Sequence, residues 1–316
     1  MRCVFVALLL AFAASASAQP AAPLRVIVVY PPGGPSDVVA RVVAERLGAR
    51  LGPPVGVENR SGASGAIGID AMAKAAPDGR TLAFSAVSPV TLLPHVARVP
   101  YDPIKDVAPV ASVMFSPVYL VGTPAFSGRT LEDAVAQARA KPGSIRLATS
   151  GVATLGHVML EQIRSAAGVD IVHVPYKGGG QVALDAAAGQ FELFTTNPAP
   201  GVNGLIAQGK LRMLAVAAPQ RLAAHPAVPT MAELGRPESN YASLFGFFAP
   251  GRTPAAEVAR LNAEVNAVLA LPAVRERIAG LDNVPAPDTP QAFARRVLQE
   301  YASNARLVAR TGLKAD

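Results

Sequence analysis

Short runs of apolar, β-branched residues alternate along the chain with amphipathic stretches that have helical spacing. The run from Leu24 to Tyr30 predicts a buried strand, and the apolar positions between Val38 and Leu47 predict a helix after it. This alternation is typical of β-α-β units and of mostly parallel sheets, so we expect an α/β fold. Further strands are expected at Val55–Asn59, Thr81–Val87, Val118–Gly122, Ile145–Thr149, Ile171–Val174, Phe191–Thr195, Leu211–Ala217 and Leu244–Ala249.

Hydroxyl residues mark several expected helix starts. Thr130, three residues before an aspartate, predicts a capping box, whereas Thr253 and Thr289 each precede a proline at a first helical position. Ser36 is likewise expected to cap the helix after the first strand. From Thr253 to the C-terminus the pattern predicts helices, with no strand after Ala249. Because a helical tail of this kind usually packs back on an earlier sheet, we expect the first domain to be discontinuous.

The first residues have the pattern of a secretory signal peptide. Arg2 supplies one positive charge, an apolar run follows from Val4 to Ala14, and small residues stand at Ala16 and Ala18. A membrane span needs roughly 20 apolar residues, and this run is too short for one. We therefore expect residues 1–18 to be removed by cleavage after Ala18 and the mature protein to be periplasmic.

Cysteine usage and charge narrow the class of protein. The single cysteine, Cys3, lies inside the expected signal peptide and precedes its apolar run, so we expect no disulfide, no thiolate metal site and no lipid anchor in the mature chain. The net charge of +7 comes from basic residues that are spread along the chain. This distribution argues against a nucleic-acid partner and favours a surface that attracts anions.

Three expected strand-to-helix turns carry glycine and hydroxyl residues: Pro31 to Asp37, Gly62 to Gly68, and Thr149 to His157. Such a turn directs unpaired backbone N–H groups and the positive end of a helix dipole toward whatever lies above the sheet, and a carboxylate or phosphate fits there. Taken alone, the first turn fits an ordinary capped connection better. Lys177 to Gly180 could also cradle an anion, or form a flexible turn before a helix. Ligands of open α/β sheets bind beyond the carboxyl ends of the strands, so these turns can converge on one cleft.

A search for catalytic groups finds little. No serine lies in a G-x-S-x-G elbow, no H-E-x-x-H motif is present, and the four histidines are scattered singly. The glycine-rich turns do not match the dinucleotide signature. We therefore expect no metal, no cofactor and no enzymatic activity. The alternative from another class is a periplasmic hydrolase that uses Ser150 with His157.

Short motifs along nearly the whole chain resemble one known family and follow its order. The chain resembles the Bug family, the substrate-binding receptors of tripartite tricarboxylate transporters. The motifs that carry the resemblance include YDPIKD at Tyr101 to Asp106, SGVATLGH at Ser150 to His157, HVPYKGGG at His173 to Gly180, GKLRMLAV at Gly209 to Val216, PAVPTMAELG at Pro226 to Gly235, and the TPQAF start at Thr289.

The resemblance implies a type II periplasmic binding fold, in which two α/β lobes joined by two crossover strands close around a ligand. Lobe 1 would comprise residues 19–124 plus 241–316, and lobe 2 residues 125–240. In the family, backbone amides, hydroxyls and ordered water hold the carboxylate of the ligand. Carried onto this chain, the resemblance implies ligand-binding roles for Pro32, Gly33, Gly34, Asp37, Ala63, Ser64, Ser88, Ser150, Gly151, Thr154, His157, Thr195, Thr196 and Asn197.

Two departures from the family bear on the ligand. Thr195-Thr196-Asn197 stands where the family often has Phe-Asp-Asn, so an acidic group that could meet an ammonium is missing. Phe245 lies where the family commonly has tryptophan, and we expect it to replace the tryptophan in packing. We therefore expect a di- or tricarboxylate, an aromatic acid or a neutral polar compound as ligand, rather than an amino acid. We also expect a monomer whose closed form docks on a membrane permease or a sensor protein.

Overall fold

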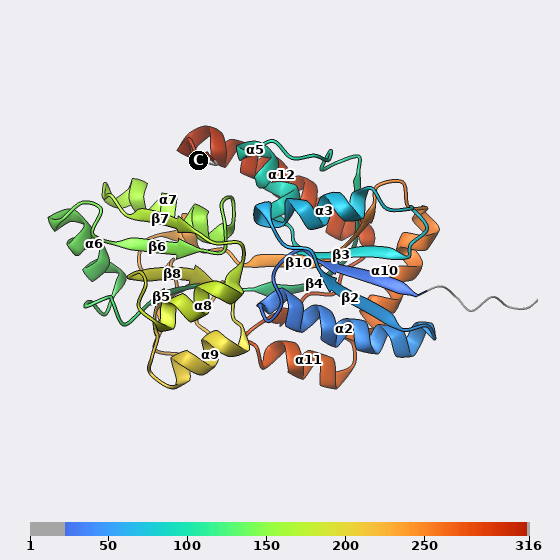
Figure 1. Cartoon of the computed structure of the whole chain (residues 1–316), viewed down its shortest axis with the longest axis horizontal. Helices are drawn as coiled ribbons and strands as arrows, with labels where there is room; N and C mark the ends of the chain where they lie inside the picture. Colours follow the sequence, from blue (N-terminus) through green and yellow to red (C-terminus); the bar gives the residue numbers. More distant parts are fainter. Residues whose placement is uncertain (1–22, 315–316) are drawn as a thin grey trace, which may run out of the picture.

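The computed structural model describes residues 23–314, so the expected signal peptide lies outside the described residues. Its strands form two separate sheets, one of six strands and one of five. The sheets lie side by side, and each is covered by helices above and below in the view of Figure 1. We call the part built on the six-stranded sheet lobe 1 and the part built on the five-stranded sheet lobe 2.

Lobe 1 has the strand order β11-β4-β10-β3-β1-β2. Strands β1, β2 and β3 are parallel, whereas β10 runs antiparallel to both β3 and β4. The strands are β1 (Leu24–Val28), β2 (Val55–Asn59), β3 (Thr81–Ala86), β4 (Val107–Ser116), β10 (Ser243–Pro250) and β11 (Val284–Pro285). The helices are α2 (Pro35–Leu51), the 3-10 turn η1 (Ala63–Gly65), α3 (Ala66–Ala73), α4 (Ser88–Thr91), α5 (Leu93–Val96), α10 (Ala255–Leu269), α11 (Pro272–Ala279) and α12 (Pro290–Thr311).

Lobe 2 has the strand order β7-β6-β8-β5-β9. Strand β6 is parallel to β7 and β8, whereas β5 is antiparallel to β8 and β9. The strands are β5 (Val118–Gly122), β6 (Arg146–Thr149), β7 (Val172–Pro175), β8 (Leu193–Thr196) and β9 (Arg212–Ala217). The helices are α6 (Leu131–Ala140), α7 (Leu155–Ala167), α8 (Gly179–Ala187) and α9 (Pro200–Ala207), with the 3-10 turn η2 (Pro237–Ser239) after β9.

The chain passes twice between the lobes. The first crossing is short, because only Pro117 separates β4 of lobe 1 from β5 of lobe 2. The return crossing runs from the end of β9 at Ala217 to the start of β10 at Ser243. Since β5 pairs only within the five-stranded sheet, we propose that the first lobe boundary lies at Pro117 rather than near residue 124. Helices α10 to α12 rejoin lobe 1, which is therefore discontinuous.

Two strands differ from the expectations. Strand β4 is absent from the predicted set because Pro109 interrupts its pattern, and a proline in a strand normally argues against one. Here Pro109 is opposite Phe248 at a register shift, and β11 pairs with β4 only at Met114 and Phe115, so Pro109 has a free strand edge beside it. The expectation of no strand after Ala249 was wrong, because the two-residue β11 forms there.

Two of the four expected helix caps form. Thr130 makes the predicted capping box, and the hydroxyl of Thr289 accepts a hydrogen bond from the backbone N–H three residues on. The predicted caps Ser36 and Thr253 were wrong. Helix α2 already begins at Pro35, so Ser36 lies inside the helix, and α10 begins one residue later than expected.

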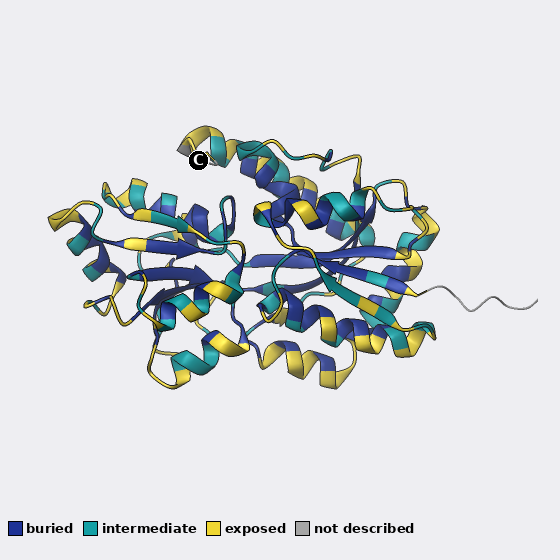
Figure 2. Cartoon of the chain, viewed as in Figure 1, coloured by how far each residue is buried: buried dark blue, intermediate teal, exposed yellow. Residues whose placement is uncertain are grey.

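The cores lie on both faces of each sheet, and Figure 2 shows the strands as the most buried part of the fold. In lobe 1, one core joins the sheet to α2, α10 and α11, and the other joins it to α3, α4 and α12. The second core also includes Ala153 and Val158 of lobe 2, so apolar packing crosses between the lobes. Within residues 23–314, none of the helices combines the length and apolarity that a membrane span requires.

Candidate ligand-binding cleft

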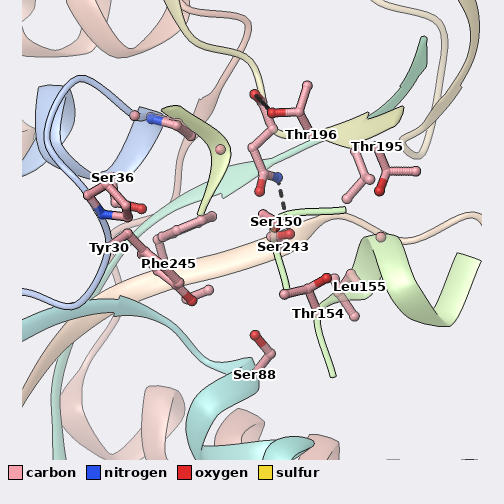
Figure 3. A pocket seen from close by; sticks show the side chains of 18 residues that line it. Tyr30, Ser36, Ser88, Ser150, Thr154, Leu155, Thr195, Thr196, Ser243 and Phe245 are labelled. Carbon is pink, nitrogen blue, oxygen red and sulfur yellow. Dashed lines mark hydrogen bonds between the residues drawn. The ribbon is translucent and has the colours of Figure 1, made fainter. Parts of the chain in front are cut away.

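A cavity of about 40 Å³ lies where the two lobes meet (Figure 3). The ends of β1, β3, β6 and β8 all reach it, as expected for ligands that bind beyond the carboxyl ends of strands. The crossover strands supply Val118, Ser243 and Phe245 to its lining. The remaining lining residues are Tyr30, Pro31, Gly34, Pro35, Ser36, Ala86 and Ser88 of lobe 1 and Ser150, Thr154, Leu155, Gly156, Gly179, Thr195, Thr196 and Asn197 of lobe 2.

The described lining residues are all uncharged. Their polar groups are hydroxyls, one side-chain amide and backbone, which offer hydrogen bonds without a formal charge. Burial raises the pKa of the Tyr30 hydroxyl to about 12, so this group is neutral at physiological pH. The cavity can therefore accept a negatively charged group through hydrogen-bond donors, but it offers no carboxylate to pair with an ammonium.

The β1–α2 turn presents the start of a helix to the cavity. Gly34 is the N-cap residue and Pro35 occupies the first helical position. The first helical hydrogen bond is donated by Val38 to the Gly34 carbonyl, at 3.2 Å. The backbone N–H groups of Ser36 and Asp37 therefore have no carbonyl partner within the helix. Together with the helix dipole, they make this turn suitable for an anion.

The Asp37 carboxylate stabilises the conformation of this turn through hydrogen bonds. Its carboxylate accepts hydrogen bonds from the Gly33 N–H at 3.0 Å, from Arg41 Nε at 3.0 Å and from Asn59 Nδ2 at 2.9 Å. Asn59 Nδ2 also donates to the Tyr30 carbonyl at 3.0 Å, so the network joins both ends of the turn. Burial alone would raise the pKa of Asp37, but the hydrogen bonds and the Arg41 charge outweigh it and lower the pKa. Asp37 does not line the cavity.

The β6–α7 turn presents a second helix start from lobe 2. The Thr154 hydroxyl donates to the Gly151 carbonyl at 2.8 Å and accepts from the His157 N–H at 3.3 Å. The first helical bond is donated by Val158. The N–H groups of Leu155 and Gly156 are thus left without a helical partner, and both residues line the cavity.

The end of β8 links the cavity to the crossover strands. Asn197 Nδ2 lies 2.9 Å from the Pro117 carbonyl and 3.1 Å from Ser243 Oγ, the bond drawn in Figure 3. Beside it, Thr195 is 1% exposed and its hydroxyl has no hydrogen-bond partner among the described residues. A buried hydroxyl without a partner is costly, and a ligand in the cavity could supply one.

The two lobes touch at the rim of the cavity. A Cβ atom added at Gly178 of lobe 2 would lie 2.3 Å from Cδ of Pro31 in lobe 1. A Cβ atom at Gly151 would lie 2.8 Å from Oγ of Ser64. The structure is therefore that of a closed arrangement, in which glycines of lobe 2 lie against lobe 1.

The fourteen residues expected to bind a ligand fall into two equal groups. Gly34, Ser88, Ser150, Thr154, Thr195, Thr196 and Asn197 line the cavity. The other seven do not line the cavity: Pro32, Gly33, Asp37, Ala63, Ser64, Gly151 and His157. Five of them shape the turns or contact the opposite lobe. Nothing in the structure gives Pro32 or Ala63 a role at the cavity.

Several lining residues escaped prediction. Ser36 and Gly179 lie in turns that were considered as anion sites, but neither was among the residues expected to contact the ligand. Ser243 and Phe245 reach the cavity because β10 returns from the far lobe, and no local motif marks that event. The amides of Leu155 and Gly156 could have been found, since they are the first two positions after the Thr154 cap.

The arrangement of Ser150 and His157 gives no support to a hydrolase. His157 Nδ1 accepts a hydrogen bond from the Ala153 N–H at 3.2 Å, and Nε2 lies 3.6 Å from Glu161 Oε1. Both ring nitrogens thus have partners other than Ser150. Among the described residues, no hydrogen bond joins Ser150 to this histidine, so the pair lacks the contact that a nucleophile and its base require.

Two α/β lobes, two crossings and a cavity between the lobes define a type II periplasmic binding fold. A family model described as "Tripartite tricarboxylate transporter family receptor" matches residues 39–313. Protein BugT of Bordetella pertussis is 38% identical over 302 residues, which cover 95% of this chain and 92% of BugT. The chain therefore belongs to the Bug family of tripartite tricarboxylate transporter receptors, a family of periplasmic solute-binding receptors.

Two similar solved structures come from Rhodopseudomonas palustris. MatC, solved with bound malate, is 28% identical, has a TM-score of 0.86, and matches over 92% of this chain and 100% of MatC. A second protein, solved with adipate, is 29% identical, has a TM-score of 0.87, and matches over 94% of this chain and 99% of that protein.

Proposed function

We propose that this chain is a receptor that captures a small carboxylate by closing its two lobes, and that it is not an enzyme. The observation that carries the proposal is the meeting of two helix starts, one from each lobe, at a single uncharged cavity. Ser36, Leu155 and Gly156, whose N–H groups have no carbonyl partner within their helices, line that cavity from opposite lobes. A carboxylate that bonds both sets has its full affinity only when the lobes are closed, so its binding stabilises the closed form.

The same lining suggests which carboxylates fit. An amino acid would bring an ammonium group into a cavity whose described lining contains no acidic side chain, and an unpaired buried charge is costly. Di- and tricarboxylates and aromatic acids avoid that cost. The similar proteins solved with malate and adipate support this class.

The closed form is the one that a partner should recognise. Membership of a transporter receptor family supports a membrane permease as that partner, and a sensor protein is the second candidate. We propose that the mature protein is a periplasmic monomer in its free state, released by cleavage after Ala18.

A ligand screen tests the proposal. Purified mature protein should show a rise in Tm with one or more acids from a panel of malate, succinate, adipate, citrate and benzoate, and little or none with aspartate or glutamate. The double variant Ser150→Ala/Thr154→Ala should weaken binding at least about tenfold, since it removes two lining hydroxyls worth roughly 1 kcal/mol each.

The matched control is Ser165→Ala, an exposed serine on the far part of α7, which should bind as the wild type does. A panel without any Tm rise would count against the receptor function. A rise with aspartate or glutamate alone would contradict the proposed ligand class.

A further inference from the structure

Two histidines stack against each other beside the β6–α7 turn. The ring centroids of His157 and His173 are 4.1 Å apart and the ring planes differ by 13°. His157 is 5% exposed, and neither ring lines the cavity. The two rings therefore have no direct contact with a ligand in the cavity.

His157 holds a strained residue of the turn. Its Nδ1 accepts the hydrogen bond from the N–H of Ala153, whose φ of +53° lies in the left-handed region. Because Nδ1 is an acceptor here, the ring is neutral and its proton is on Nε2, which faces Glu161. Ala153 directly precedes the Thr154 cap, so this bond fixes the direction in which helix α7 starts.

His173 holds the other side of the same turn. Its Nε2 lies 2.8 Å from the Thr149 hydroxyl oxygen. That hydroxyl accepts from the Gly151 N–H at 3.2 Å and donates to the Gly151 carbonyl at 3.0 Å. Since its single proton is used on the carbonyl, His173 Nε2–H is the donor in the remaining bond. The turn therefore uses Nδ1 of His157 as an acceptor and Nε2–H of His173 as a donor.

Protonation of His157 would break this arrangement. The added proton would sit on Nδ1 and point at the Ala153 N–H, so an acceptor would become a second donor. The charged groups that face the pair are Glu161 and Arg164, both on α7, and Arg164 forms an ion pair with Glu161. Helix α12, which packs against α7, contributes apolar Leu307 and Val308 to the cluster that contains Val158.

His173 does not take part in titration near neutral pH. Burial, together with the charges of His157 and Arg164, lowers its pKa to about 4.

We infer that His157, supported by His173, is a positioning residue for ligand binding that holds the β6–α7 turn in its binding form only while its ring is neutral. The inference rests on the proposed function, because the turn carries the Leu155 and Gly156 amides that would meet the carboxylate. Ligand affinity should fall at least about tenfold when this ring is protonated.

The direct test needs no ligand. In mature protein labelled with ¹⁵N, NMR should show His157 as the Nε2–H tautomer at pH 7.5. The amide signals of Ala153 and Gly156 should shift with the same midpoint as the His157 ring when the pH is lowered. An Nδ1–H tautomer, or amide signals that move independently of the ring, would overturn the inference.

A variant separates this role from ordinary structural support. Asn carries an acceptor oxygen as many bonds from Cα as Nδ1, and it does not titrate, so His157→Asn should keep the Ala153 bond and abolish the pH response. With malate as probe, His157→Asn should bind as tightly at the pH where NMR finds the wild-type ring protonated as it does at pH 7.5, whereas the wild type weakens tenfold. His95→Asn in lobe 1, where His95 Nε2 meets the Tyr301 carbonyl, is the control and should behave as the wild type does.

The two proposals fail in different ways. If malate does not bind the wild type at pH 7.5, malate is excluded as a ligand and the NMR titration alone decides the role of His157. If malate binds but His157→Asn keeps the wild-type pH response, the receptor function stands and the inference about His157 is wrong.

Discussion

Gly151 of lobe 2 lies so close to Ser64 of lobe 1 that a Cβ atom added at Gly151 would be 2.8 Å from the Ser64 hydroxyl oxygen. Gly178 meets Pro31 in the same way, at 2.3 Å. Both glycines have positive φ values, of +146° and +138°, which other residues rarely adopt. The rim of the closed cleft therefore depends on two positions without a side chain, and each offers a test of closure.

Gly178→Ala should prevent full closure and weaken ligand binding at least about tenfold, because the new methyl group would overlap the Pro31 ring. Small-angle scattering with ligand should show a larger radius of gyration than in the wild type. The double variant Gly178→Ala/Pro31→Ala should recover part of the affinity, since it removes the ring atoms that clash.

The control for this variant is Gly143→Ala. Gly143 also has a positive φ, +74°, but a Cβ atom there would approach Asp170 and Val172 of its own lobe no closer than 3.6 Å. It should lose about 1 kcal/mol of folding stability without losing affinity. Equal affinity losses in Gly143→Ala and Gly178→Ala would show that the cleft does not close as described.

Asp37→Asn should destabilise the β1–α2 turn, because the turn loses the charged acceptor that Gly33, Arg41 and Asn59 share. We expect the free energy of unfolding at pH 7 to fall by about 2 kcal/mol. The pKa of Asp37 is lowered by folding, so its stabilisation is present above the ordinary value of 3.8 and is lost as the pH falls through the folded value.

Urea unfolding of wild type and Asp37→Asn between pH 7 and pH 3 checks this. The difference in stability between the two proteins should be constant above about pH 5 and shrink in more acidic buffer. A difference that stays constant down to pH 3 would mean that the Asp37 charge contributes nothing to the turn.

Thr195→Val should have opposite effects on the free and the bound protein. Without ligand, it removes a buried hydroxyl that has no partner among the described residues, so Tm should stay the same or rise slightly. With ligand, it removes a donor to the bound molecule, so affinity should fall by about five- to tenfold. Differential scanning calorimetry and titration calorimetry measure the two effects separately.

Thr91→Val is the matched control for Thr195→Val. The Thr91 hydroxyl is also buried, but it bonds the Val87 carbonyl and Glu300, and Thr91 does not line the cavity. This variant should lose stability and keep affinity. Unchanged affinity in Thr195→Val would remove Thr195 from the ligand-binding residues.

Most of the fold was predictable because its signals are local. The Val55–Asn59 and Val118–Gly122 strands have the predicted bounds, and the Thr130 and Thr289 caps form as expected. Strand β4 was not predictable from its own residues, because Pro109 fits the sheet through the register shift against Phe248 and the free strand edge beside it. Whether these residues form a strand depends on pairing with β10, which is distant in sequence.

The site was predictable in its turns but less so in its side chains. The sequence indicates that Ser150 and Thr154 belong to a strand-to-helix turn, and both line the cavity. It does not indicate where a polar side chain points. Asp37 turns back to its own loop because Gly33, Arg41 and Asn59 satisfy it there, and His157 turns to Ala153. Such choices depend on partners that only the fold brings together.

We propose that the helix starts of both lobes bind one carboxylate between them. Titration calorimetry of the mature protein with malate and with its diamide, which lacks the negative charges, tests this most directly. We expect binding of the acid to be at least about a hundredfold tighter than binding of the diamide, together with a smaller radius of gyration in scattering with the acid alone. Equal affinity for the acid and the diamide, or tight binding without compaction, would contradict it.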